Sequence, residues 1–209
     1  MSVIGLLSSS LGKSDNDTNI ALAKNIATSE DRSAIIELVD NLQNNDKKIQ
    51  SDCIKTLYET AYLKPALIAD YYSVFCDLLL SKNNRLVWGG MIALATITEI
   101  KHRQVFESLS LIAETVKKGS VITIDCGVEI YSKLNMHNEY RDVVEPLLID
   151  ELWRCPIKQL PQYIEKSLVS INRQNKEIYQ DIINKRIIEC ERDAQSKRLN
   201  KALKLIDSK

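Results

Sequence analysis

The feature that most constrains this 209-residue chain is an internal repeat of about 37 residues. When Asp46, Asn83, Gly119 and Ile157 are aligned, successive copies are offset by 37, 36 and 38 residues. Apolar or small residues then fall into register in columns four positions apart: Ile49, Leu86, Ile122 and Leu160; Cys53, Gly90, Cys126 and Ile164; Leu57, Leu94, Ile130 and Leu168, followed directly by Tyr58, Ala95, Tyr131 and Val169. Positions four apart share one helix face, so each copy is predicted to contain a helix with the same apolar stripe. A single copy cannot bury that stripe alone, which predicts that neighbouring copies stack.

The rest of the sequence predicts an all-helical chain. Six glycines and four prolines are too few for the frequent turns of an all-β sandwich. Asp46 and Asn83 are predicted N-caps, and Pro65 and Pro156 are predicted to stop the helices before them. The predicted helices span residues 17–27, 30–43, 47–62, 66–81, 85–100, 103–118, 120–135, 138–153, 158–171 and 175–206, the last as one helix or two.

The repeat resembles those of the HEAT/armadillo family of helical-repeat proteins. The resemblance rests on the apolar columns, the helix–turn–helix period and the polar residue at the turn, and covers roughly residues 30–172. It implies an all-α fold, a right-handed α-α superhelix of about four two-helix repeats. Within one domain of residues 1–209, we expect an N-terminal tail and helix over 1–28, repeats over 29–172, and a C-terminal helical cap over 173–209. Pro146 and Pro161 suggest an irregular last repeat.

Composition argues against several classes of function. Lys plus Arg equals Asp plus Glu, 28 against 28, whereas proteins that bind nucleic-acid backbones usually carry a basic excess. Five cysteines without a CxxC pair and two histidines offer no zinc or disulfide framework, so we expect reduced thiols, no metal and a cytoplasmic location. No apolar stretch is long enough to span a membrane, and we expect no membrane partner.

Catalytic motifs are also missing from the sequence. His102 and His137 fall at predicted helix junctions, where solvated loop histidines are the simplest interpretation. There is no His-Glu pair of the kind used by HEAT-type metal hydroxylases, and no phosphate-binding glycine loop. We therefore expect no catalytic residues and no cofactor.

The family resemblance indicates where a binding site would lie. Second helices of HEAT-like repeats line the concave surface, which implies binding positions at Lys48, Asp52, Arg85, Trp88, Asp125 and Glu129. The resulting prediction is a non-catalytic scaffold that binds a protein or peptide along this face, with partner identity and oligomeric state left open. The alternative is a DNA-binding protein of the alkylpurine DNA glycosylase type, because such HEAT-like enzymes hold bases with tryptophans beside an Asp and an Arg; here the tryptophans are Trp88 and Trp153. Local departures at Gly89, Gly127, Pro146 and Pro161 are further places for a specialised site.

Overall fold

The computed structural model describes residues 2–13, 15 and 17–209, and these residues form helices without any strand. The chain divides into two compact units, Met1–Cys126 and Gly127–Lys209, with the boundary inside one helix. The first unit holds η1 (Ile4–Leu6), α1 (Asp17–Ser29), α2 (Arg32–Asp40), η2 (Asn41–Gln43), α3 (Lys47–Leu63), η3 (Pro65–Leu67), η4 (Ala69–Tyr71), α4 (Tyr72–Leu78), α5 (Asn84–Ile97), α6 (His102–Glu107), α7 (Leu109–Lys118) and the start of α8 (Val121–Leu134). The second unit holds the rest of α8, α9 (Asn138–Arg154), α10 (Leu160–Ser167), α11 (Lys176–Arg186), η5 (Ile187–Glu189) and α12 (Asp193–Asp207).

Side-chain caps set the starts of the repeat helices. The Asp46 carboxylate accepts the backbone N–H of Lys48 at 2.7 Å, and the Asn83 side chain accepts that of Arg85 at 3.1 Å. Both predicted N-caps are therefore confirmed, because each side chain satisfies an N–H that has no partner within its own helix. Pro65 follows the last turn of α3 and begins η3, as predicted for a residue that cannot continue a helix.

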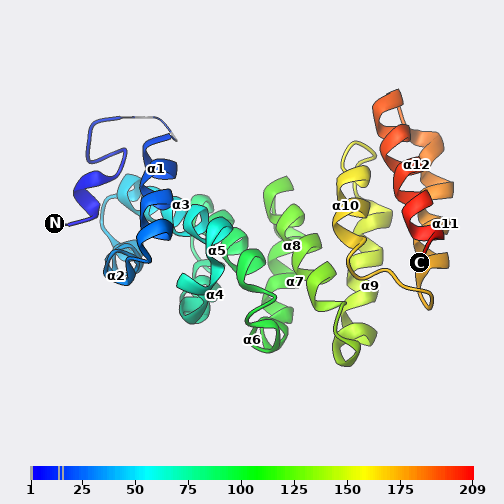
Figure 1. Ribbon diagram of the computed structural model, residues 1–209, viewed down its shortest axis with the longest axis horizontal. Helices are drawn as coiled ribbons and strands as arrows, with labels where there is room; N and C mark the ends of the chain where they lie inside the picture. The colour runs from blue at the N-terminus through cyan, green and yellow to red at the C-terminus, as the bar shows by residue number, and fades with distance from the viewer. Residues whose placement is uncertain (1, 14, 16) are drawn as a thin grey trace. The chain divides into compact units, whose positions relative to one another are not determined.

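In the first unit, α3 packs against both α1 and α5, and α5 also packs against α4 (Figure 1). The predicted apolar columns form this core: Cys53, Leu57 and Leu94 are all completely buried. Ile49 and Tyr58 of the columns are half-buried, and Ile122 in the first turn of α8 is 42% exposed. Its side chain borders a cavity along α3 and α5 and does not pack in the core.

In the second unit, α10 and α11 each pack against both α9 and α12. Tyr131, Tyr163 and Tyr179 are the largest side chains that are fully buried there, together with Ile182 and Ile183 of α11. The buried Arg186 of α11 donates a hydrogen bond to the Leu152 carbonyl of α9 at 2.8 Å. Val169, the last member of its column, is 56% exposed because it lies just past the end of α10.

The structure refines several predicted helix boundaries. The stretch 175–206, predicted as one helix or two, is two helices, α11 and α12, separated by η5 and an extended Cys190. The stretch 103–118 is divided at Ser108, whose hydroxyl lies 2.7 Å from that of Tyr72. Pro146 sits inside α9, which continues through it, whereas Pro161 occupies the first turn of α10, where its missing N–H needs no intrahelical partner. Among the described residues, no helix is both long and apolar enough to cross a membrane.

Candidate binding site

An open cavity of about 660 Å³ lies at the N-terminal ends of α3 and α5 in the first unit. Three segments line it: residues of the chain that precedes α1, the first turns of α3, and the first turns of α5 with its cap. Among the lining residues that the structure describes, Trp88 is the one apolar side chain. The lining residues that the structure describes are Ser8, Ser9, Lys13, Asp15, Lys47, Lys48, Ser51, Asp52, Asn83, Asn84, Arg85 and Trp88.

A short chain of amide hydrogen bonds fixes the start of α5 against α3. The Asn83 amide donates to the Gln50 side-chain oxygen at 3.1 Å, and the Gln50 amide donates to the Asn44 carbonyl at 2.7 Å. Because Asn83 also caps α5, this chain ties the first turn of α5 to α3. Arg85 and Trp88, on the first turns of α5, are thereby positioned at the cavity.

Gly89 lets α3 and α5 approach closely beside the cavity. A Cβ atom at Gly89 would lie 2.2 Å from Cγ1 of Ile54 on α3, far inside van der Waals contact. At Gly90, a Cβ atom would lie 2.9 Å from the Phe75 carbonyl oxygen. Both glycines therefore allow close helix packing, Gly89 against α3 and Gly90 against α4.

The segment before α1 forms a wall of the cavity, and sequence reasoning missed it. Leu7 is completely buried, and the Ser8 N–H donates to the Asn19 side chain at 3.0 Å. The Ser9 N–H donates to the Asp52 carboxylate of α3 at 2.8 Å. The signal for this anchoring was the apolar run over residues 3–7, which indicates buried side chains in a segment without helical periodicity.

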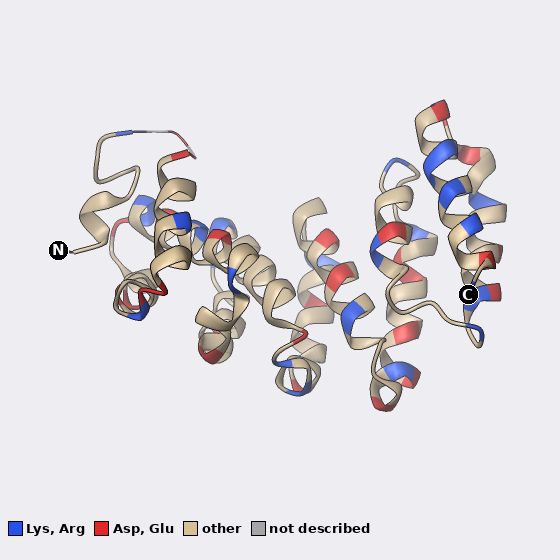
Figure 2. Cartoon of the chain, viewed as in Figure 1, with Lys and Arg blue, Asp and Glu red and all other residues tan. Residues whose placement is uncertain are grey.

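Charges of both signs line the cavity, with cations in excess. Among the described lining residues, Lys13, Lys47, Lys48 and Arg85 face two carboxylates, Asp15 and Asp52. Figure 2 shows that Lys and Arg, and Asp and Glu, occur throughout both units, so this local excess is not a property of the whole chain.

Trp88 also borders two smaller cavities. One, of about 340 Å³, lies among α4, α5, α7 and α8. The other, of about 230 Å³, continues along α3 and α5 and is lined by Ser51, Ile54, Lys55, Tyr58, Arg85, Trp88, Gly89, Ile92 and Ile122. In that cavity burial raises the pKa of the Tyr58 hydroxyl, and the charge of Lys55 is paired with Glu59 at 3.2 Å. Its other side chains are mostly apolar, in contrast to the first cavity.

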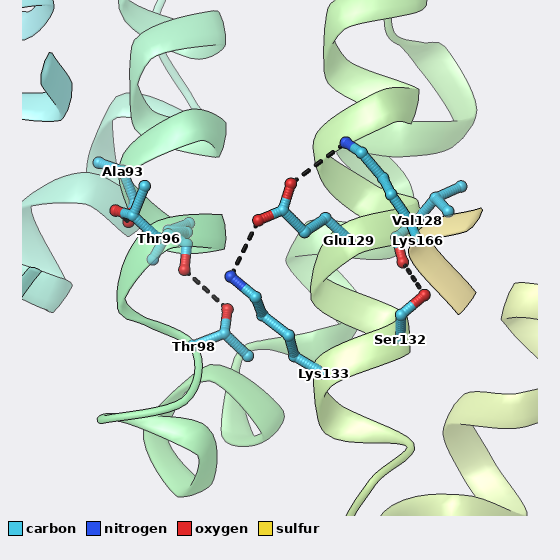
Figure 3. A network of polar contacts seen from close by, with 9 residues as sticks. Ala93, Thr96, Thr98, Val128, Glu129, Ser132, Lys133 and Lys166 are labelled. Carbon is cyan, nitrogen blue, oxygen red and sulfur yellow. Dashed lines mark hydrogen bonds and ion pairs between the residues drawn. The ribbon is translucent and has the colours of Figure 1, made fainter. Parts of the chain in front are cut away.

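Four of the six predicted binding residues, Lys48, Asp52, Arg85 and Trp88, line the same cavity. Asp125, half-buried on α8, does not line it. Glu129 belongs to the second unit and forms ion pairs with Lys133 at 2.9 Å and Lys166 at 3.1 Å (Figure 3).

The environment of Glu129 is that of a paired carboxylate. Burial alone would raise its pKa, but the hydrogen bonds and charges of Lys133 and Lys166 outweigh that effect and hold the pKa below its ordinary value. Glu129 therefore stays ionised and engaged with α10, where Lys166 lies in the last turn.

The histidines and the second tryptophan are not among the residues that line this cavity. His102 begins α6 and His137 precedes α9, at the predicted junctions, and both are half-buried. Trp153 lies on α9 in the second unit with its ring 5.9 Å from the ammonium of Lys185.

No known protein family and no curated protein matches this sequence. Solved structures do match its fold. A designed armadillo repeat protein in complex with the peptide (KR)4 has a TM-score of 0.66 and 14% identity, covering 89% of this chain and 86% of that one. Computationally designed armadillo repeat proteins for modular peptide recognition give a TM-score of 0.64 and 14% identity, covering 97% and 98%. An engineered protein gives 0.62 and 18%, covering 100% of each chain.

These matches define the class of the fold. The chain is all-α and has the fold of the armadillo type of helical-repeat superhelix, which confirms the fold class predicted from the repeat columns. At this level of identity the likeness concerns the fold alone.

Proposed function

We propose that this chain is a non-catalytic binding module that holds a protein or peptide partner at the cavity around Arg85 and Trp88. The observation that carries the proposal is the position of the half-buried Trp88, whose side chain borders three cavities at once. Trp and Arg are the residue types that most often dominate binding energy at protein interfaces. The cavity floor is also held rigidly by the Asn83–Gln50–Asn44 hydrogen bonds, so little ordering accompanies binding.

A peptide suits this surface better than a small apolar ligand. Pockets for small molecules are lined mainly by apolar side chains, whereas the described lining of this cavity offers Trp88 alone. The polar cavity and the more apolar one beside it are adjacent along α3 and α5, as an extended chain with alternating side chains would require. Two of the similar folds are described as peptide-binding, which favours the same use here.

The proposal is tested by selecting peptides from a random displayed library on the purified protein and titrating the recovered peptides individually. We expect Trp88→Ala to weaken binding by about 30-fold or more, the loss typical of a central tryptophan. Trp153→Ala makes the same truncation on α9 in the second unit and should leave binding unchanged. Equal loss with both variants, or no selected peptide that depends on Trp88, would contradict the proposal.

A further inference from the structure

We propose that the partner is an acidic peptide segment that places carboxylates against Lys47, Lys48 and Arg85 and an apolar side chain in the cavity beside Trp88. This inference rests on the proposed function, and it specifies the chemistry of the partner.

The cations of the larger cavity form no ion pair within the part of the chain that the structure describes, and Lys13 alone among them acts by its charge on a carboxylate of the cavity, that of Asp15. Lys13, Lys47, Lys48 and Arg85 form no ion pair with any carboxylate of those residues. By contrast, Lys55 in the neighbouring cavity is paired with Glu59. Four such positive charges gathered at one cavity attract anionic groups and repel cationic ones.

Both carboxylates of the described lining already serve the fold. Asp52 accepts the Ser9 N–H at 2.8 Å and so holds the N-terminal wall. Asp15 accepts the Thr18 N–H at 2.8 Å in the first turn of α1, and this hydrogen bond lowers the pKa of Asp15. The two carboxylates are thus engaged with backbone donors, while Lys47, Lys48 and Arg85 remain open to a partner.

The N-terminal ends of α3 and α5 do not account for the preference of the cavity for anions. The side chains of Asp46 and Asn83 already accept N–H groups in the first turns of α3 and α5. The attraction for anions therefore comes from the four side-chain cations and not from uncapped helix starts.

The charge of the surrounding unit favours a peptide over a nucleic acid. Residues 1–126 contain 13 Lys and Arg against 15 Asp and Glu, a net charge of −2, so the excess of cations at the cavity is local and is not shared by the rest of the unit. A nucleic-acid backbone carries phosphates along its whole length and gains affinity from an extended basic surface. A short acidic segment needs only this local cluster.

The smaller cavity that adjoins the first one is the reason to expect an apolar side chain in the peptide. Its volume of about 230 Å³ lies between Trp88 and Tyr58, with Ile54, Ile92 and Ile122 around it. Ile122 is 42% exposed there, and an apolar side chain of the partner would cover it. Burying such a group adds hydrophobic free energy to the ionic attraction.

The test compares synthetic peptides of equal length that share leucines at the same positions and carry glutamate, glutamine or lysine at the remaining ones. Binding to the full-length protein is measured by fluorescence anisotropy of labelled peptides, with single-stranded DNA as a further probe. We expect the glutamate peptide to bind at least about tenfold more tightly than the others, and its affinity to fall as salt is raised and charges are screened.

Charge-reversal variants locate the effect. Arg85→Glu and Lys48→Glu should each weaken the glutamate peptide by about fivefold and strengthen the lysine peptide. The matched control, Lys24→Glu, makes the same change in net charge at an exposed position of α1 outside the cavity and should alter neither. Circular dichroism of each variant confirms that the helices are retained.

The outcomes separate the two proposals. If the glutamine or lysine peptide binds as well as the glutamate peptide and still depends on Trp88, the acidic preference is wrong and the binding function stands. If single-stranded DNA binds more tightly than every peptide, the partner is a nucleic acid and the acidic-peptide inference is overturned. If no probe responds to Trp88→Ala, both proposals fail.

Discussion

Replacing Gly89 by alanine tests the close contact that places Trp88 beside α3. The added Cβ would lie 2.2 Å from Cγ1 and 3.0 Å from Cγ2 of Ile54, a side chain that is 1% exposed. Ile54 is branched at Cβ and cannot rotate both γ carbons away, so α3 and α5 must separate.

Two opposing contributions determine how far Gly89→Ala changes the free energy of unfolding. Alanine is favoured over glycine within a helix by about 1 kcal/mol. Forcing an extra carbon into a packed core typically destabilises by about 1–3 kcal/mol, and this contact lies at the severe end of the range. We therefore expect Gly89→Ala to lower the free energy of unfolding by about 1–2 kcal/mol. Gly5→Ala is the control, because a Cβ there has nothing within 4 Å.

Urea unfolding followed by circular dichroism measures both variants, together with a double-mutant cycle on Ile54. Ile54→Ala removes the two γ carbons that oppose the new Cβ. In that background, Gly89→Ala should become stabilising, because the helix-propensity gain then opposes one remaining contact, 3.2 Å to the Cβ of residue 54, which a small shift relieves. A stabilising effect of Gly89→Ala in the wild-type background, or equal effects in both backgrounds, would show that Ile54 does not oppose the added Cβ.

Three further predictions concern other parts of the chain. Arg186→Met should lower the free energy of unfolding by about 1–3 kcal/mol, because it removes the donor to the buried Leu152 carbonyl; a change below about 0.5 kcal/mol in urea unfolding would contradict this. Hydrogen bonds to Glu37 from the Ser2 hydroxyl and the Val3 N–H hold the pKa of Glu37 below its ordinary value, so this stabilisation is complete above that value and is lost as pH falls through the lowered pKa. Hydrogen exchange of residues 2–9 should accordingly rise in acid before that of the helices, and Glu37→Gln should remove the pH dependence. Cys190, the most exposed cysteine, should react first with a thiol reagent identified by mass spectrometry, whereas burial raises the pKa of Cys53 to about 12 and should protect it until the chain unfolds.

The fold was predictable because apolar residues at helical spacing mark the face of each helix that is buried. Leu57 and Leu94 are 37 residues apart, one repeat, and Cys53 lies four positions before Leu57 on the same helix face; all three are buried in the structure. Asp46 and Asn83 were predicted to cap helices because each is a polar residue directly before an apolar stripe, and both side chains accept N–H groups of the first turn. These signals are local in sequence, so they need no knowledge of which helices meet.

The site was only partly predictable because its geometry depends on distant contacts. Asp52 was predicted to bind a partner, yet it accepts the N–H of Ser9, 43 residues away, and so supports the cavity wall. Glu129 was predicted on the same face, yet Lys166 of α10 pairs with it. No pattern within one repeat reveals either partner. The sequence prediction and the cavity coincide at Lys48, Asp52, Arg85 and Trp88.

The fluorescence of Trp88 measures directly whether the partner binds at this cavity. The chain has two tryptophans, so in the Trp153→Phe protein all tryptophan emission comes from Trp88. Adding the glutamate peptide should shift that emission to shorter wavelengths with saturation, as the ring leaves water, and Arg85→Glu should move the midpoint to higher peptide concentration. Saturable binding of the labelled peptide with unchanged Trp88 emission would contradict the account, because the partner would then bind elsewhere on the protein.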